Sequence, residues 1–415
     1  MATNTDIPQG YKATALGIIP QEWEVMRLGD IVSITSGESP SLYHLKAEGK
    51  YPYVKVEDLN NCEKYQESSR EYSDDNNTTI KAGSIIFPKR GASILNNKVR
   101  IAAKDIQMDS NMMAITPHTA IIDTEFLYIR ILHERLYRIA DTSSIPQINN
   151  KHIIPYKIAV PPLAEQRKIA EVLGVWDEAI EKQARLIEKL ALRKRALMQR
   201  LLSAKLRLPG FSEPWKKVKL GDIGDTYNGL SGKNKDDFEY GNAQFIPYIN
   251  VFSNERIDTN NLGCVQIKPN EQQNTVKYGD IFFTVSSETP DEVGMASVLL
   301  EHLDNTYLNS FCFGYRLNNF STLNPFFAAY LFRTEHFRNY MSVLAQGSTR
   351  FNISKKEVMK LKIDLPTIEE QTAIAEVLTA ADREIELAKE KLERLRRQKR
   401  GLMQQLLTGK KRIKI

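Results

Sequence analysis

Residues Glu165–Leu173 read EQRKIAEVL, and residues Glu370–Leu378 read EQTAIAEVL, so one segment occurs twice at an offset of 205 residues. Upstream, Trp23–Ile31 reads WEVMRLGDI and Trp215–Ile223 reads WKKVKLGDI, at an offset of 192 residues. The chain therefore contains two copies of one plan, whose dissimilar middles differ in length by 13 residues. In each copy the first and last segments are similar and the sequence between them is not. This pattern favours one function that the two copies perform on two different targets. Plain duplication followed by sequence drift is the alternative.

Each repeated segment opens a stretch in which apolar residues recur at alternating steps of four and three, the spacing of a coiled-coil seam. We expect one long helix over 164–207 and a second over 368–415. A helix of about 40 residues is roughly 60 Å long, and it cannot bury a narrow apolar seam alone. We therefore predict that the two helices pair as an antiparallel coiled coil, with a pseudo-twofold internal repeat. Parallel pairing, or pairing with another chain, is the alternative. The seam positions of the first helix are Ile169, Leu173, Trp176, Ile180, Gln183, Ile187, Leu190, Lys194, Leu197 and Leu201.

The regions before the two helices, 1–163 and 208–367, have the pattern of mixed α/β domains, so the expected fold class is α+β. Short apolar runs between polar loops rich in Asn, Ser, Gly and Lys predict strands. Longer amphipathic stretches predict helices over Phe126–Tyr137 and Pro325–Leu344. The expected strands are Ile31–Ile34, Tyr51–Val56, Ser84–Phe87, Ile158–Val160, Phe245–Ile249, Asp280–Val285, Phe313–Leu317 and Leu361–Ile363.

The composition limits the class of protein. Of 415 residues, 42% are hydrophobic and 26% are charged, which is ordinary for a globular protein with real cores. No run of 18 apolar residues predicts a membrane span, and the polar first ten residues argue against a secretory signal. Cys62, Cys264 and Cys312 lie too far apart for a zinc cluster and suit a reducing compartment, so we expect a cytoplasmic protein. The net charge of +6 permits nucleic-acid binding without establishing it.

The sequence contains no recognisable catalytic motif. The Gly232-Lys233 pair lacks the upstream glycine of a phosphate loop, the six histidines show no metal-ligand spacing, and no GxSxG elbow occurs. Asn324-Pro325-Phe326-Phe327 is similar to the amino-methyltransferase motif that holds a target base, but it lacks the second proline. A helix start with proline at its first position is the favoured interpretation. We expect no catalytic residue, no metal site and no cofactor site in this chain.

The ordered set of motifs resembles the specificity subunit of type I restriction–modification systems over essentially the whole chain. The matching stretches are Ile19–Trp23 with Leu28–Ile31, Trp215 with Leu220–Ile223, Pro161–Gln166, Leu365–Gln371 and Gly347–Ser354. The resemblance implies two target-recognition domains, 1–163 and 208–367, each reading one half of a bipartite, gapped DNA site. It implies that the helices 164–207 and 368–415 set the gap and dock two methyltransferase subunits, which bring AdoMet. Restriction or translocase subunits can join the complex.

The candidate base readers are polar side chains in loops, because Arg and Lys suit guanine while Asn and Gln suit adenine. In the first copy, loops 88–98 and 143–151 supply Lys89, Arg90, Ser93, Asn96, Asn97, Lys98, Gln147, Asn149 and Asn150. In the second copy, loops 285–289 and 346–350 and a strand start supply Tyr248, Asn250, Ser286, Ser287, Gln346, Ser348, Thr349 and Arg350. The loop 88–98 is basic and its counterpart 285–289 is not, so the two cannot read the same bases. A solvated turn is the alternative for each loop.

Three other functions remain open from the sequence. The chain could serve a methylation system that has no restriction partner. It could be a coiled-coil scaffold that displays two protein-binding modules and does not bind DNA; exposed apolar loops would favour that reading, whereas these loops are polar. An enzyme with a site scattered across the fold is the third, and no motif supports it.

Overall fold

The computed structural model describes residues 7–142, 145–238 and 240–413. The chain forms two compact units. Unit 1 comprises Met1–Ala184 and Lys391–Ile415, and unit 2 comprises Arg185–Glu390. Each of the two long helices, α5 (Leu163–Leu201) and α11 (Ile368–Leu407), begins in one unit and ends in the other. The compact units therefore divide the predicted spacer helices between them. No helix in the described part of the chain is long and apolar enough to span a membrane.

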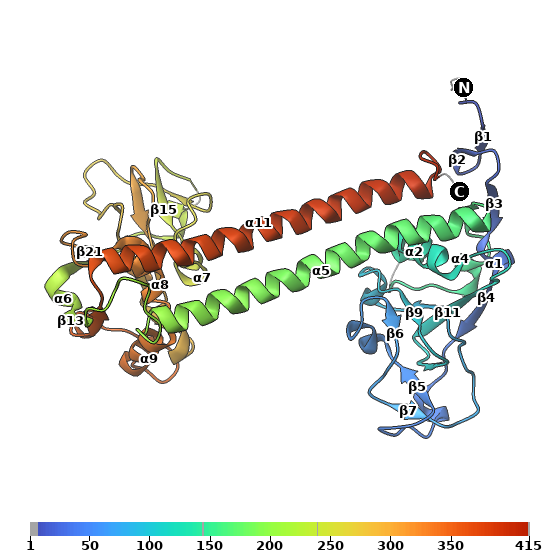
Figure 1. The fold of residues 1–415 in the computed structure, drawn as a ribbon, viewed down its shortest axis with the longest axis horizontal. Coiled ribbons are helices and arrows are strands. Elements are labelled where there is room, and N and C mark those ends of the chain that lie inside the picture. The colour runs from blue at the N-terminus through green and yellow to red at the C-terminus, as the bar shows by residue number, and fades with distance from the viewer. Residues whose placement is uncertain (1–6, 143–144, 239, 414–415) are drawn as a thin grey trace. The chain divides into compact units, whose positions relative to one another are not determined.

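Unit 1 is built on a five-stranded sheet with the strand order β4-β11-β8-β9-β6. A three-stranded lobe of order β10-β5-β7 lies beside it, and strand β12 pairs antiparallel with β3 at the start of α5 (Figure 1). The strands are β1 (Tyr11–Thr14), β2 (Gly17–Pro20), β3 (Glu24–Arg27), β4 (Val32–Ser36), β5 (Tyr51–Val54), β6 (Tyr65–Gln66), β7 (Tyr72–Ser73), β8 (Ile85–Pro88), β9 (Arg100–Ala102), β10 (Gln107–Met108), β11 (Met112–Pro117) and β12 (Lys157–Val160). The shorter helices are α1 (Leu28–Ile31), α2 (Thr124–Glu134), α3 (Leu136–Ile139) and α4 (Asn150–Ile153).

Unit 2 repeats this plan with a four-stranded sheet of order β14-β21-β17-β19 and a lobe of order β16-β15-β20. Strand β13 pairs antiparallel with β23, as β3 does with β12 in unit 1. The strands are β13 (Lys216–Lys219), β14 (Gly224–Asn228), β15 (Ala243–Ile246), β16 (Gly263–Val265), β17 (Ile281–Thr284), β18 (Ser286–Ser287), β19 (Ala296–Val298), β20 (Thr306–Leu308), β21 (Cys312–Leu317), β22 (Phe351–Asn352) and β23 (Lys362–Leu365). The shorter helices are α6 (Leu220–Ile223), α7 (Tyr248–Ser253), α8 (Pro325–Leu331), α9 (Glu335–Leu344) and α10 (Lys355–Val358). The internal repeat is thus a repeat of the fold.

The core of each unit takes side chains from both long helices. In unit 1, the cluster around the buried Trp23 includes Leu173 from α5 and Leu406 and Leu407 from α11. In unit 2, the corresponding cluster includes Leu201 from α5 and Leu378 from α11. Each globular region is therefore completed by the end of a helix that begins in the other unit.

The two helices run antiparallel in each unit, as the seam pattern predicts. In unit 2, Lys194 of α5 forms an ion pair with Asp382 of α11 at 2.7 Å, while Arg207, beyond the end of α5, binds Glu370 at the start of α11. In unit 1, Asp177 of α5 pairs with Lys399 of α11. Lys194 is a seam position of the first helix, and Lys399 continues the steps of four and three on the second, between Leu395 and Leu402. Each of these two charges meets an opposite charge on the facing helix. This pairing fixes the register of the two helices.

Three elements differ from the prediction. The helix expected over 126–137 is two helices, α2 and α3, because Arg135 between them has a positive φ of 63° and interrupts the helix. The strand expected over 245–249 ends at Ile246, because Pro247 precedes a helix that opens at Tyr248. The helix expected over 325–344 is two helices, α8 and α9, and Thr334 caps the second by accepting a hydrogen bond from the Phe337 N–H at 3.3 Å. The predicted helix start at Asn324 is confirmed, since its side chain caps α8 and a proline follows it at the first helical position.

Candidate nucleic-acid interface

The two candidate loops of unit 1 lie against each other. The Gly91 N–H donates to the Pro146 carbonyl, and the Ile148 N–H donates to the Lys89 carbonyl, both at 2.8 Å. Between these bonds, Arg90 and Gln147 form an antiparallel β-bridge. Residues 89–91 and 146–148, from two distant parts of the sequence, therefore form a single surface. We call this surface, and its counterpart in unit 2, the junction. Of the predicted loop 143–151, Ser143 and Ser144 lie outside the described residues.

Unit 2 builds the same junction from different side chains. Strand β18 pairs with β22, so that Ser286 lies opposite Asn352, and the Ile353 N–H donates to the Val285 carbonyl at 3.0 Å. A bridge between Gln346 and Asn352 closes the following hairpin. The segment 285–289, predicted to be a loop, therefore contains a short paired strand. The backbone geometry matches unit 1, while the side chains that it presents do not.

In unit 1, four of the nine predicted base readers are exposed and the other five are half-buried. Arg90, Asn96, Asn149 and Asn150 are exposed, and Ser93 and Gln147 are half-buried. The Lys98 ammonium contacts the Asn60 side chain. Burial lowers the pKa of the half-buried Lys89, and the adjacent Arg90 lowers it further. The exposed arginine beside a partly desolvated lysine makes this junction basic.

Asn97 is a correction to the predicted set. Its amide donates to the Leu132 carbonyl at 3.0 Å and accepts from the Leu136 N–H at 2.9 Å. Both ends of the side chain therefore hold the turn between α2 and α3, which gives Asn97 a structural role.

Asn250 is a second correction. It is 3% exposed, its amide donates to the Asp258 and Asn261 carbonyls, and its oxygen accepts from the Asp258 N–H. These three bonds close a turn inside unit 2. They also supply the partners that the polar atoms of a buried amide need.

The other predicted readers of unit 2 divide into buried and exposed groups. Ser286 and Ser287 are each 8% exposed, and the Ser287 hydroxyl donates to Glu292 at 3.1 Å. The Tyr248 hydroxyl donates to the Ser286 carbonyl at 3.1 Å, so this tyrosine supports the junction. The exposed predicted residues of unit 2 are those of the hairpin, namely Gln346, Ser348, Thr349 and Arg350.

Comparison with known protein families identifies the two units. Residues 20–191 and 212–397 each match the type I restriction modification DNA specificity domain. The chain belongs to this family. Its function is DNA recognition in a type I restriction–modification system, and the two matches correspond to the two copies that the sequence repeat defines.

Known specificity subunits are similar to this chain over nearly all of its residues. It is 26% identical to the type I restriction enzyme MjaVIII specificity subunit of Methanocaldococcus jannaschii, over 95% of this chain and 94% of the relative. A solved chain described for complex assembly and conformational transition of the type I R-M system has a TM-score of 0.65, 20% identity, and coverage of 94% and 99%. The S subunit of M. genitalium has a TM-score of 0.52, 18% identity, and coverage of 93% and 96%. Both structures share its fold.

A third segment joins the junction in each unit of the specificity subunit, and the sequence analysis missed it. The Asn111 carbonyl accepts from the Lys89 N–H at 2.8 Å, and the Phe311 carbonyl accepts from the Val285 N–H at 2.9 Å. Both residues are exposed at the tip of a turn, and Phe311 is 55% exposed. A local pattern could have located both turns, namely Asp-Ser-Asn at 109–111 and Asn-Ser-Phe at 309–311. In each, the first side chain accepts a hydrogen bond from the N–H two residues later, which forms a turn before a strand.

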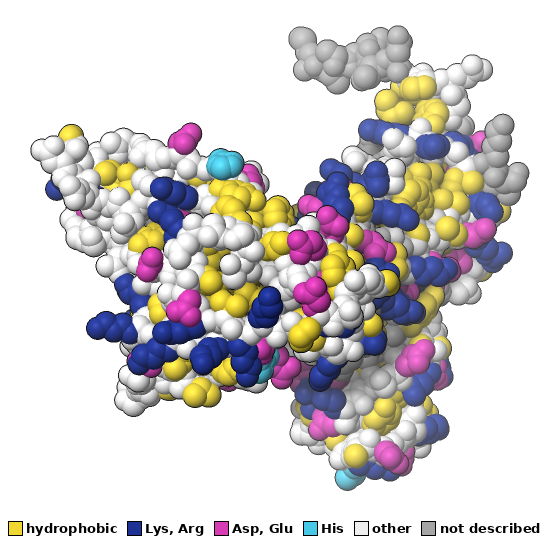
Figure 2. Space-filling view, turned by 60° about the vertical axis from the view of Figure 1, so that its left-hand side comes forward, with side chains coloured by type: hydrophobic (Ala, Val, Ile, Leu, Met, Phe, Trp, Pro, Cys, Tyr) yellow, Lys and Arg dark blue, Asp and Glu magenta, His cyan; other side chains and the backbone are white. Residues whose placement is uncertain are grey.

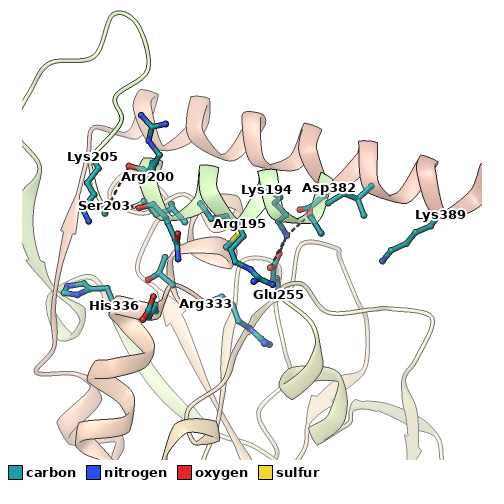
Figure 3. A pocket seen from close by; sticks show the side chains of 17 residues that line it. Lys194, Arg195, Arg200, Ser203, Lys205, Glu255, Arg333, His336, Asp382 and Lys389 are labelled. Atoms are coloured by element: carbon teal, nitrogen blue, oxygen red, sulfur yellow. Dashed lines mark hydrogen bonds and ion pairs between the residues drawn. The ribbon is translucent and has the colours of Figure 1, made fainter. Parts of the chain in front are cut away.

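The specificity subunit also has an open pocket of about 940 Å³ in unit 2, where the end of α5 meets α9 and α11 (Figure 3). Lys194 lies at its wall between Glu255 at 2.8 Å and Asp382 at 2.7 Å. Burial lowers the pKa of Lys194, but its hydrogen bonds with these two carboxylates outweigh burial and leave the pKa raised. Lys194 is therefore charged and committed to these contacts, while the pocket rim carries further basic residues. The rim residues are Arg195, Arg200, Lys205 and Lys389.

The surface of the specificity subunit carries both signs of charge. Lys and Arg side chains gather in several groups on the face drawn in Figure 2, with acidic side chains between them. In the described part of the chain, no group of three His, Cys, Asp or Glu side chains is placed to hold a metal ion.

Proposed function

We propose that each unit reads one half of a bipartite, gapped DNA site through its junction of three segments. The observation that carries the proposal is the repeat of one backbone junction with two sets of side chains. Unit 1 has Lys89 and Arg90 where unit 2 has Val285 and the buried Ser286. Lys89 and Val285 make the same pair of backbone hydrogen bonds, since each donates its N–H to the turn and accepts an N–H at its carbonyl from Ile148 or Ile353. Side chains at base edges read the identity of the bases. Two junctions with the same backbone and different side chains therefore suit two different half-sites.

We propose further that α5 and α11 set the gap between the half-sites. Both helices are shared by the two units, so the sequence fixes the number of helical residues between the two globular regions. Ion pairs on the seam, such as Lys194 with Asp382, oppose any slip of one helix along the other. A change in helix length should therefore change the gap and leave both half-sites as they were.

The chemistry in this proposal belongs to other chains. Two methyltransferase subunits dock on the helices and supply AdoMet, restriction or translocase subunits join the complex, and this chain directs them without catalysing a step. The basic rim of the pocket at the end of α5 supports docking of an acidic protein surface there. We place this work in the cytoplasm, and the three cysteines, which are free thiols, suit that compartment.

The test is a single-molecule methylation map of DNA from cells that express the chain together with its methyltransferase partner. We expect one modified motif with two defined parts and a fixed gap, and its loss when the gene is deleted. Exchanging residues 88–98 for another loop should alter one part of the motif only. An active methyltransferase partner with no change in the map would refute the proposal and favour a protein scaffold.

A further inference from the structure

Two basic side chains lie directly opposite each other where β13 pairs with β23. The register places Lys219 opposite Lys362, and the matching pair of strands in unit 1 places Arg27 opposite Lys157. Like charges at directly opposed positions destabilise a strand pair. Both copies nevertheless place two cations there, which is expected where an anion binds across the pair.

In unit 2, further lysines converge on the same place. Lys219, Lys355, Lys356 and Lys360 line an open pocket of about 290 Å³, together with Gly221, Thr226 and Met359; we call it the lysine pocket. Lys360 pairs with Glu357 at 2.7 Å, and the Lys355 ammonium contacts the Asn228 side chain. Within the described chain, no carboxylate pairs with Lys219 or Lys356. The pocket therefore holds a concentrated positive charge that the protein itself does not neutralise.

The lysine pocket adjoins the junction of unit 2. Strand β22 ends at Asn352, and Lys355 opens α10 three residues later. Three residues span at most about 10 Å, and each strand of a DNA duplex carries one phosphate per roughly 3.4 Å of helix axis. A duplex whose bases contact the hairpin 346–350 therefore passes the pocket within a few nucleotides.

We propose that the lysine pocket binds a phosphate of the DNA backbone beside the half-site that unit 2 reads. This inference rests on the proposed function of that unit. Lysine suits phosphate binding here because its ammonium acts as a point charge. Unlike the guanidinium of arginine, it needs no fixed bidentate geometry. Such a contact sets the register of the duplex on unit 2 and carries no sequence information.

Unit 1 has fewer basic residues at the corresponding place. At the offset of 205 residues, Asn150 and Pro155 stand where unit 2 has Lys355 and Lys360, whereas Lys151 matches Lys356, and at the offset of 192 residues Arg27 matches Lys219. The proposal concerns unit 2, where four lysines line the pocket and two of the matching residues of unit 1 are basic.

The experiment compares the double variant Lys219→Gln/Lys356→Gln with a charge-matched control, Lys235→Gln/Lys268→Gln, in the complete complex. The control lysines are exposed residues of unit 2 that do not line the pocket. Binding is measured from 50 to 200 mM salt on the methylated motif and on random DNA. If the contact with this one phosphate is lost, the slope of log K against log salt becomes shallower by about 0.9, so the ratio of wild-type to variant affinity falls about 3.5-fold over this range. The loss should be equal on both DNAs, and Lys219→Arg/Lys356→Arg should restore the slope.

Two results would overturn the inference. A variant slope equal to that of the control shows that the pocket binds no phosphate. Loss of methyltransferase from the complex with an unchanged slope shows that the lysines bind an acidic protein surface instead. A wild-type complex that prefers no motif contradicts the proposed function, and the slope on random DNA still tests the pocket.

Discussion

Replacing Gln166 by alanine should destabilise unit 1, because this side chain ties the start of α5 to the start of α2. Gln166 is fully buried. Its amide donates to the Ile121 carbonyl at 2.9 Å and to the Pro161 carbonyl at 2.8 Å, and its oxygen accepts from the Asp123 N–H at 2.8 Å. Asp123 in turn caps α2. The variant leaves two carbonyls and one N–H without partners.

The magnitude follows from these three groups. An unsatisfied buried polar group costs about 1–3 kcal/mol, and water that enters the space left by truncation reduces this cost toward the lower end. Three groups at roughly 1–1.5 kcal/mol each give a loss of about 3–5 kcal/mol. For a unit of roughly 200 residues, each kcal/mol lowers the melting temperature by about 2–4 °C, so we expect a fall of about 6 °C or more.

The assay is thermal unfolding combined with amide hydrogen exchange, which locates the loss. Gln371→Ala is the matched variant in unit 2, because Gln371 contacts the Thr322 and Pro366 carbonyls and the Asn324 N–H at 2.9, 3.0 and 2.9 Å. Each variant should release amides of its own unit and leave the other protected. Arg167→Ala, an exposed neighbour, should change stability by less than about 0.5 kcal/mol. A Gln166→Ala protein that melts within about 2 °C of the Arg167→Ala protein would refute the reasoning.

Three further substitutions separate the parts of the proposed interface. Arg90→Ala should cost about 1–3 kcal/mol of discrimination at one half-site if the side chain forks a guanine, and equal losses on specific and random DNA would mean phosphate contact only. Phe311→Ala should weaken binding at the other half-site without lowering the melting temperature, because the ring is exposed. Lys194→Met should cost about 1.5 kcal/mol of unfolding free energy, because it removes the ammonium that contacts both Glu255 and Asp382, while Tyr330 still donates to Asp382; a melting temperature equal to wild type contradicts this.

The sequence predicted the long helices well because their signal is local and repeated. A seam at alternating steps of four and three identifies a helix and also its need for a partner. Even the polar seam position Lys194 is explained by that rule, since the facing helix supplies Asp382. The strand over 245–249 was wrong in its second half, because Tyr248 and Ile249 suit a strand by residue type while Pro247 opens a helix.

The candidate site was predicted less completely, because residue type does not give side-chain direction. Asn97 and Asn250 have the right chemistry for adenine, yet each amide satisfies backbone groups inside its unit. The meeting of Lys89 with Ile148, and of both with the turn at Asn111, depends on pairing between segments far apart in the chain. No local pattern encodes such pairing, although the repeat shows where the matching segments of the second copy must lie.

The exchange of helix ends between the two units sets the boundaries of any fragment that can fold. A fragment limited to 208–367 lacks Leu201 from α5, Leu202 directly after it, and Ile374 and Leu378 from α11, all four of which are buried in the core of unit 2. Burying each such side chain contributes about 1.5–3 kcal/mol, so the four supply roughly 6–12 kcal/mol, as much as the whole stability of a typical domain.

We therefore expect the fragment 185–390, which is continuous in sequence, to unfold cooperatively, and the fragment 208–367 not to fold. Circular dichroism during thermal unfolding distinguishes the two. A cooperative transition of the shorter fragment at the same temperature would show that the helix ends add little to unit 2. If the expectation holds, an exchange of recognition specificity between related chains must keep both helix ends with each globular region, because the region that reads DNA and the helices that complete its core fold as one body.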